Sequence, residues 1–184
     1  MKHQWLTESD AYAVIVVTYD GSPFIDEALS YLEGCKHPLL LCINTKDDNA
    51  YDPAGFYLAK ELGLDKFILL HDSCFVKDQA VLDTLFNKQG NVAISNGLLM
   101  CMGKFEDVPE LPPKPRDKAS AVYFESALPN LIPNHSVLFP GFTDSEMREH
   151  KHGKERMVIE NKYLKKYKGC WNWGHVEQEM QRVL

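Results

Sequence analysis

The chain has 184 residues, of which 45% are hydrophobic and 25% are charged, which is the balance of a globular protein with a core. Its length suits one ordinary domain, and its formal net charge of −6 argues against a generic basic nucleic-acid binder. No apolar run approaches the length of a membrane span, and the N-terminal residues lack the apolar stretch of a signal peptide. We therefore expect a cytoplasmic protein whose five scattered cysteines are free thiols.

Strand and helix patterns alternate over the first hundred residues. Residues 11–18 form a continuous β-branched run, which is typical of a strand buried on both faces of a parallel sheet. Ser22 and Pro23 are expected to open the helix that follows, and Gly34 to end it. The further expected elements are a strand over 39–43, a helix between Asp52 and Gly63, a strand over 67–70, a helix from Asp78, and short strands at 91–95 and 98–102. This alternation predicts a doubly wound α/β fold, with a mostly parallel sheet flanked by helices.

The rest of the chain breaks this alternation. Several prolines among charged residues predict a loop over 103–118, and residues 119–128 suit either a helix or a strand. The segment 146–167 is expected to be mostly helical, with an interruption near Gly153. Its apolar side chains recur at spacings of four, at Ile159, Tyr163 and Tyr167. We expect one domain over 1–184 with three parts: an α/β half over 11–102, a loop-rich half over 103–145 and a basic helical segment over 146–184.

Three polar clusters follow three of the expected strands, at the edge where an open α/β sheet binds its ligands. They are Thr-Tyr-Asp at 18–20, Asn-Thr-Lys-Asp-Asp at 44–48 and His-Asp-Ser at 71–73. Loops after strands are commonly polar, so one cluster alone is weak evidence, but three together favour a ligand site. The carboxylate of Asp72 suits a hard cation such as Mg²⁺ or Mn²⁺, or else the capping of a turn.

Several common site signatures are absent from the sequence. Residues 19–23 read Tyr-Asp-Gly-Ser-Pro, which is neither of the glycine-rich loops that cradle phosphate in dinucleotide oxidoreductases and P-loop nucleotidases. The chain also has no GxSxG elbow, so an α/β-hydrolase is unsupported.

The order of the motifs resembles the nucleotide-sugar-dependent glycosyltransferases of the GT-A fold, of the family 2 type. The resemblance covers residues 11–102: an apolar strand that runs into Thr-Tyr-Asp, a helix with Pro-Phe-Ile-Asp-Glu-Ala-Leu, a strand that ends in Asn-Thr-Lys-Asp-Asp and a strand that ends in an acidic motif. The stretch 160–168 is also similar to the tails of some small glycosyltransferases. The resemblance implies a Rossmann-like sheet and the transfer of a sugar from a nucleoside-diphosphate sugar, such as a UDP-sugar, to a hydroxyl of a glycan or other acceptor.

The resemblance also implies roles in donor binding. Thr18, Tyr19 and Asp20 would lie beside the base and the ribose, and Asn44 and Asp48 would extend that pocket.

His71, Asp72 and Ser73 stand at the place of the family's Asp-x-Asp motif, which holds a divalent metal on the donor diphosphate. The second acid of that motif is missing here, so a bound Mn²⁺ or Mg²⁺ would need another ligand. The candidates by position are His150 and His152 near the C-terminal end of the chain, with His135 as a third.

Transfer to a hydroxyl needs a base near the acceptor, and Glu125 and Asp144 are the best-placed acids after the proline-rich segment. Residues 151–168 hold seven Lys or Arg against two Glu in an otherwise acidic chain. This segment is either a solvated face or a cover for the diphosphate that includes Lys154 and Arg156, and its charge also suits contact with an anionic acceptor or a membrane surface.

Two other classes of function stay open. One is a nucleotidyltransferase on a related sheet, although the glycine- and basic-rich loop that it needs does not follow the first strand. The other is a nucleotide-sugar-binding module without activity, which the missing second acid after Asp72 favours.

Overall fold

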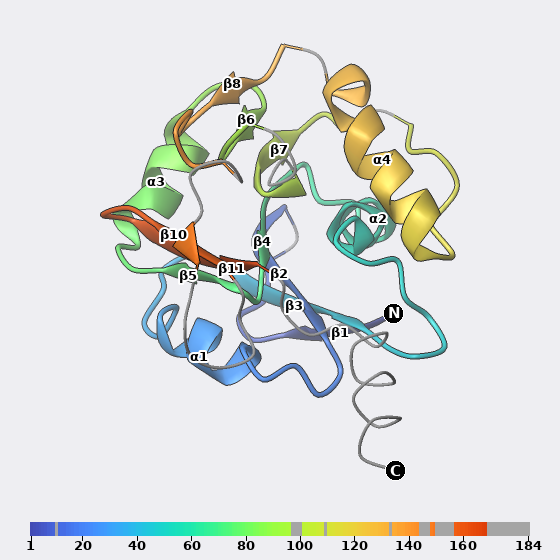
Figure 1. Ribbon diagram of the computed structural model, residues 1–184, viewed down its shortest axis with the longest axis horizontal. Coiled ribbons are helices and arrows are strands. Elements are labelled where there is room, and N and C mark those ends of the chain that lie inside the picture. The colour runs from blue at the N-terminus through green and yellow to red at the C-terminus, as the bar shows by residue number, and fades with distance from the viewer. Residues whose placement is uncertain are drawn as a thin grey trace.

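The computed structural model describes residues 1–9, 11–96, 101–108, 110–132, 134–143, 148–149 and 157–168. These residues form an α/β fold with a mixed seven-stranded main sheet, helices on both of its faces, and a second sheet of four strands (Figure 1). The helices are α1 Ile25–Ser30, α2 Ala54–Glu61, α3 Ala80–Asn87 and α4 Lys118–Leu131. None of the helices described is long and apolar enough to cross a membrane.

The strands alternate with these helices through the first half of the chain. They are β1 Lys2–Trp5, β2 Tyr12–Tyr19, β3 Leu39–Asn44, β4 Lys66–His71, β5 Cys74–Val76, β6 Val92–Ala93, β7 Gly103–Glu106, β8 Ser136–Val137, β9 Arg148–Glu149, β10 Met157–Glu160 and β11 Leu164–Lys168. The main sheet has the order β1-β3-β2-β4-β7-β6-β8, and the second sheet has the order β5-β11-β10-β9. Strand β2 is parallel to both β3 and β4, while β1 and β7 run antiparallel to their neighbours. The predicted α/β class is confirmed, and the architecture is compatible with a Rossmann-like fold.

Strand β2 is apolar on both sides because both faces of the main sheet are covered. Val14 and Val16 point into a core that α3 and the second sheet complete. Ile15 and Val17 point into the opposite core, beneath α2 and α4. Side chains alternate across a strand, so a run without polar residues fits only a strand with a core on each side. This is the arrangement that the β-branched run predicts.

The expected helices are present, with changes at their ends. Helix α1 has only six residues and no side-chain cap, since Ser22 lies in the turn before it. Residues 119–128, which the sequence left open, belong to α4. The Asp117 carboxylate accepts a hydrogen bond of 2.7 Å from the backbone N–H of Ser120 and so caps this helix.

The expected loop over 103–118 is wrong at its start, because residues 103–106 form strand β7. A Cβ at Gly103 would overlap the backbone of Val92, so glycine allows β7 to lie against β6. The fully buried Lys104 pairs with Glu106 at 2.6 Å, and this ion pair compensates the lysine charge inside the sheet. The expected strand 98–102 falls partly outside the described residues, and Cys101 and Met102 are not in a strand.

The expected helix over 146–167 is also wrong, because its described residues form strands β9, β10 and β11 and the turn between the last two. Strands β10 and β11 pair as an antiparallel hairpin, with Val158 opposite Tyr167. The Asn161 side chain accepts hydrogen bonds from the backbone N–H groups of Tyr163 and Leu164, each 2.8 Å long, and so builds the hairpin turn. The spacing of four between Tyr163 and Tyr167 is also compatible with a strand, since four is a multiple of two.

Gly55 sets how closely α2 packs on the main sheet. A Cβ at this position would overlap the side chain of Leu69 and lie 3.1 Å from Val17 Cγ2. Leu69 is fully buried, so it has little room to move away. We predict that Gly55→Ala lowers the free energy of unfolding by about 1–3 kcal/mol, in spite of alanine's better helix propensity.

Urea denaturation of the variant and the wild type measures this difference. Gly141→Ala is the matched control, because nothing lies within 4 Å of a Cβ there. Its effect should stay within about 0.5 kcal/mol. An unchanged or higher stability of Gly55→Ala would mean that α2 does not pack on β4 as described.

Candidate functional site

The carboxyl ends of β2 and β4 lie side by side and bring two of the predicted polar clusters together. Val17 is paired with His71 in the parallel register, and the backbone N–H of Asp72 donates to the Val17 carbonyl at 2.9 Å. The hydroxyl of Thr18 donates to Asp72 Oδ2 at 2.7 Å. The turn after β2 and the residues after β4 therefore form one polar rim.

The Asp72 carboxyl group is buried at this rim, with 6% of the residue exposed. Burial raises the pKa of Asp72, while hydrogen bonds from Ser22 and Thr18 and the charge of Lys166 act in the opposite direction. These contacts tie the turn before α1 to the end of β4. The carboxyl group is thus held by the protein's own donors and points inward.

Lys166 reaches the same rim from the second sheet. Its strand β11 pairs with β5, which places Lys166 opposite Cys74. The ammonium lies 2.5 Å from Ser73 Oγ and 3.3 Å from His71 Nδ1, and only 6% of the residue is exposed. The sequence pattern predicts a basic helical segment here, but this lysine lies in a strand. Read as a strand, with alternation of period two, the same segment turns every second side chain inward.

His71 has one ring nitrogen without a partner. Burial, aided by the Lys166 charge, lowers the pKa of His71 to about 4, so the ring is neutral near pH 7. An ammonium only donates, so Nδ1 is the acceptor toward Lys166, and this assigns the proton to Nε2. Nε2 is buried without a hydrogen-bond partner, and the nearby carboxylate oxygen of Asp52 is 3.9 Å away. The rim therefore contains an unsatisfied N–H donor.

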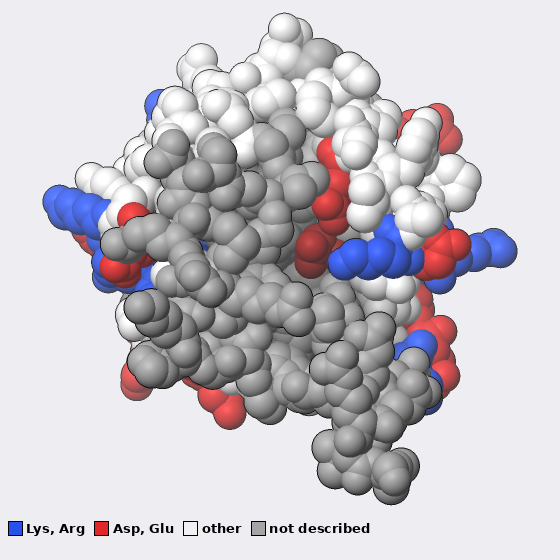
Figure 2. Space-filling model, viewed as in Figure 1, with Lys and Arg blue, Asp and Glu red and all other residues white. Residues whose placement is uncertain are grey.

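Carboxylates from two helical elements surround Tyr19 at this rim. Burial raises the pKa of the Tyr19 hydroxyl well above its usual range, and the charges of Asp52, Asp72 and Glu125 add to the effect. The pKa of the buried Cys101 thiol is also raised, by burial first and then by Glu125 and Asp52. Asp52 lies just before α2, whereas Glu125 lies on α4. Figure 2 shows acidic surface beside α4, on its side toward the centre of the view.

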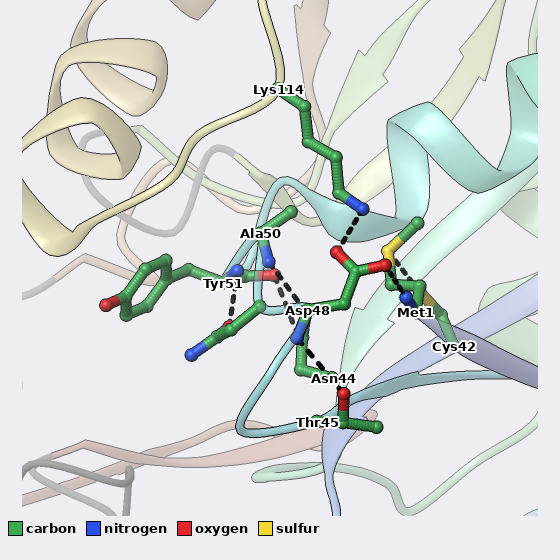
Figure 3. A network of polar contacts seen from close by, with 9 residues as sticks. Met1, Cys42, Asn44, Thr45, Asp48, Ala50, Tyr51 and Lys114 are labelled. Carbon is green, nitrogen blue, oxygen red and sulfur yellow. Dashed lines mark hydrogen bonds and ion pairs between the residues drawn. The ribbon is translucent and has the colours of Figure 1, made fainter.

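The polar side chains of the third predicted cluster, at 44–48, are bound by other groups of the protein (Figure 3). Asn44 accepts a hydrogen bond from the Ala50 N–H at 3.0 Å and donates to the Tyr51 carbonyl at 3.1 Å. Asp48 is bound by the N-terminal amine of Met1 and, at 2.5 Å, by Lys114. These contacts shape the loop after β3, so a role for Asn44 and Asp48 in binding a base stays a prediction.

Of the remaining predicted site residues, the structure describes Asp20 and His135. Asp20 is exposed in the turn after β2, where its N–H donates to the Asn44 carbonyl at 3.0 Å. His135 lies between α4 and β8, and its Nδ1 is 3.0 Å from the Ile132 carbonyl. The other predicted residues lie outside the described part of the chain: Asp144, His150, His152, Lys154 and Arg156.

The predicted divalent metal stays a prediction, because two of its three predicted ligands, His150 and His152, lie outside the described residues. Asp72 is bound by hydroxyl donors, and the oxygen of Ser73 is bound by the ammonium of Lys166. A metal at Ser73 would meet this positive charge. Over the described ranges, no group of three or more His, Cys, Asp or Glu side chains is placed to hold a metal ion. The cation that this part of the rim does contain is Lys166.

Comparison with known proteins gives no relative for this chain. No protein-family model, no curated protein and no solved structure matches it.

Proposed function

We propose that this protein is a glycosyltransferase that moves a sugar from a nucleoside-diphosphate sugar to an acceptor hydroxyl. The observation that carries the proposal is the meeting of three kinds of group at one rim: the cation Lys166, the carboxylate Asp52, and the donors Tyr19 and His71. The charge of Glu125 on α4 also raises the pKa of Tyr19. Ligands of open α/β sheets bind at the carboxyl ends of parallel strands, which is where these groups lie. On this proposal the main sheet is the nucleotide-binding sheet of a GT-A fold.

Each kind of group matches one demand of the reaction. Departure of the diphosphate builds negative charge on the leaving oxygen, and a nearby fixed positive charge stabilises it. Sugar hydroxyls are hydrogen-bond donors, and the partly exposed carboxylate of Asp52 is an acceptor for them. The phenol of Tyr19 stays protonated, so it is able to donate to a ribose or phosphate oxygen.

Glu125 is the base in this proposal. The acceptor oxygen attacks the anomeric carbon and passes its proton to the Glu125 carboxylate, while the bond from that carbon to the phosphate oxygen breaks and its electron pair leaves with the diphosphate. Attack opposite the leaving group inverts the configuration of the sugar. Support comes from the place of Glu125 on α4, close enough to raise the pKa of both Tyr19 and Cys101.

Asp72 is a positioning residue in this scheme. Its carboxyl group joins Thr18 and Ser22, on one side of the rim, to the end of β4. Tyr19 follows Thr18 in the chain, and His71 precedes Asp72. The hydrogen bond between Thr18 and Asp72 therefore fixes the distance between the donors Tyr19 and His71.

We predict that Glu125→Gln lowers the rate of sugar transfer about 100-fold or more, because glutamine accepts no proton from the acceptor. Water serves as the simplest acceptor, so the measurement is the release of nucleoside diphosphate from a panel of nucleoside-diphosphate sugars. Donor affinity should change little. Glu61→Gln, at the exposed end of α2, is the control and should keep the wild-type rate. Equal rates in the wild type and Glu125→Gln would rule out Glu125 as the base.

The raised pKa of Asp72 predicts an unusual pH dependence of stability. A carboxyl group whose pKa rises on folding destabilises the folded state once the pH exceeds its ordinary value of 3.8. Relative to the wild type, Asp72→Asn should therefore gain stability as the pH rises from about 4 to about 7.

Asp83→Asn provides the opposite case. A hydrogen bond from Lys36 lowers the pKa of Asp83, so its carboxylate stabilises the fold above pH 3.8 and loses that effect as the pH falls. Relative to the wild type, this variant should lose stability over the same rise in pH. Urea denaturation along the pH series measures both slopes, and slopes of the same sign would contradict the buried position of Asp72.

A further inference from the structure

Lys166 is a buried cation that forms no ion pair with any of the described residues. Its two contacts within the described residues are the hydroxyl of Ser73 and the ring nitrogen of His71, both of which are neutral groups. Asp72 is near enough for the two charges to interact, but no ion pair joins them. A buried charge is costly unless it is paired. A negatively charged ligand at the rim would supply the missing partner.

The ammonium also has a donor to spare. It carries three N–H groups, and the contacts with Ser73 and His71 occupy two of them. The hydroxyl of Ser73 and the ring of His71 hold the lysine side chain at the end of β4, so the position of the remaining N–H group is fixed. A preorganised donor of this kind favours an anionic oxygen.

His71 provides a second, independent observation. Its Nε2–H is buried and has no acceptor within hydrogen-bond distance among the residues that the structure describes, although 94% of the surface of the residue is covered. The nearby carboxylate oxygen of Asp52 lies 3.9 Å from this nitrogen, which is too far for a hydrogen bond. Buried donors are normally satisfied, so this N–H indicates a ligand oxygen that the protein itself does not provide.

We propose that Lys166 and His71 bind the diphosphate of the sugar donor directly, and that the ammonium of Lys166 replaces the divalent metal expected beside Asp72. The identity of the ligand as a nucleoside diphosphate rests on the proposed function. When the bond between the anomeric carbon and the phosphate oxygen breaks, the electron pair stays on the diphosphate, whose oxygen accepts the N–H of Lys166. No metal ion takes part in this step, since the lysine carries the stabilising charge.

Binding of nucleoside diphosphates, measured by isothermal titration calorimetry with the full chain, tests this proposal. One titration is run in EDTA and the other in MnCl₂, and the wild type should bind one of the diphosphates with the same affinity in both. Lys166→Met keeps the length of the side chain and removes its charge. It should weaken binding about 10- to 100-fold, as expected for the loss of a hydrogen bond between charged groups.

Two further variants separate charge from structure. Lys165→Met changes the neighbouring lysine, whose ammonium lies 4.8 Å from the centre of the Tyr167 ring, and should bind like the wild type. Lys166→Arg retains the positive charge and should bind more tightly than Lys166→Met. Circular dichroism verifies that each variant is folded, and the wild-type titrations decide the metal question even if Lys166→Met does not fold.

The outcomes distinguish this inference from the proposed function. Binding that requires Mn²⁺, or that persists unchanged in a folded Lys166→Met, would overturn the role of Lys166 and leave the glycosyltransferase proposal standing. A wild-type chain that binds no nucleoside diphosphate in either condition would overturn the proposed function, and this inference with it.

Discussion

The organisation of the rim depends on the contacts of one buried group, the ammonium of Lys166. It joins β11 of the second sheet to the residues that follow β4 of the main sheet, through Ser73 and His71. It therefore connects two parts of the chain that are more than ninety positions apart in sequence. Because a buried lysine charge is costly unless an anion compensates it, the surroundings of this one group favour an anionic ligand at the rim.

The remaining chemistry of the rim follows from how burial and charge are distributed around that lysine. Asp72 is buried and bound by hydroxyl donors, so its carboxyl group organises the turns. Asp52 is partly exposed, and it leaves the Nε2–H of His71 unsatisfied. The Asp52 carboxylate therefore lies beside the Nε2–H of His71, and the ammonium of Lys166 lies at the Nδ1 of the same ring. In the proposed function, the acceptor serves the hydroxyls of the sugar and the donors serve the oxygens of the diphosphate.

The local pattern of the sequence was sufficient for the parallel strands β2, β3 and β4 of the main sheet, and insufficient for β7 and for the second sheet. The β-branched run of β2 requires a core on both faces, and that requirement is visible without any structure. The position of Lys166 depended on a contact between β11 and β5, which no local pattern encodes. A spacing of four between Tyr163 and Tyr167 fits a helix and a strand equally. The turn at Asn161 decides for a hairpin, but in the sequence Asn161 looks like any polar loop residue. The rim formed by Thr18 and Asp72 was predictable from strand ends, but the cation beside it was not.

The most direct measurement of the central claim is a crystal structure of the chain with a bound nucleoside diphosphate, grown in EDTA. The account predicts a phosphate oxygen within hydrogen-bond distance of Lys166 Nζ, with the Nε2–H of His71 donating to the same diphosphate. A diphosphate bound elsewhere on the molecule, or one seen at this rim only when a divalent ion lies between it and Asp72, would contradict the account.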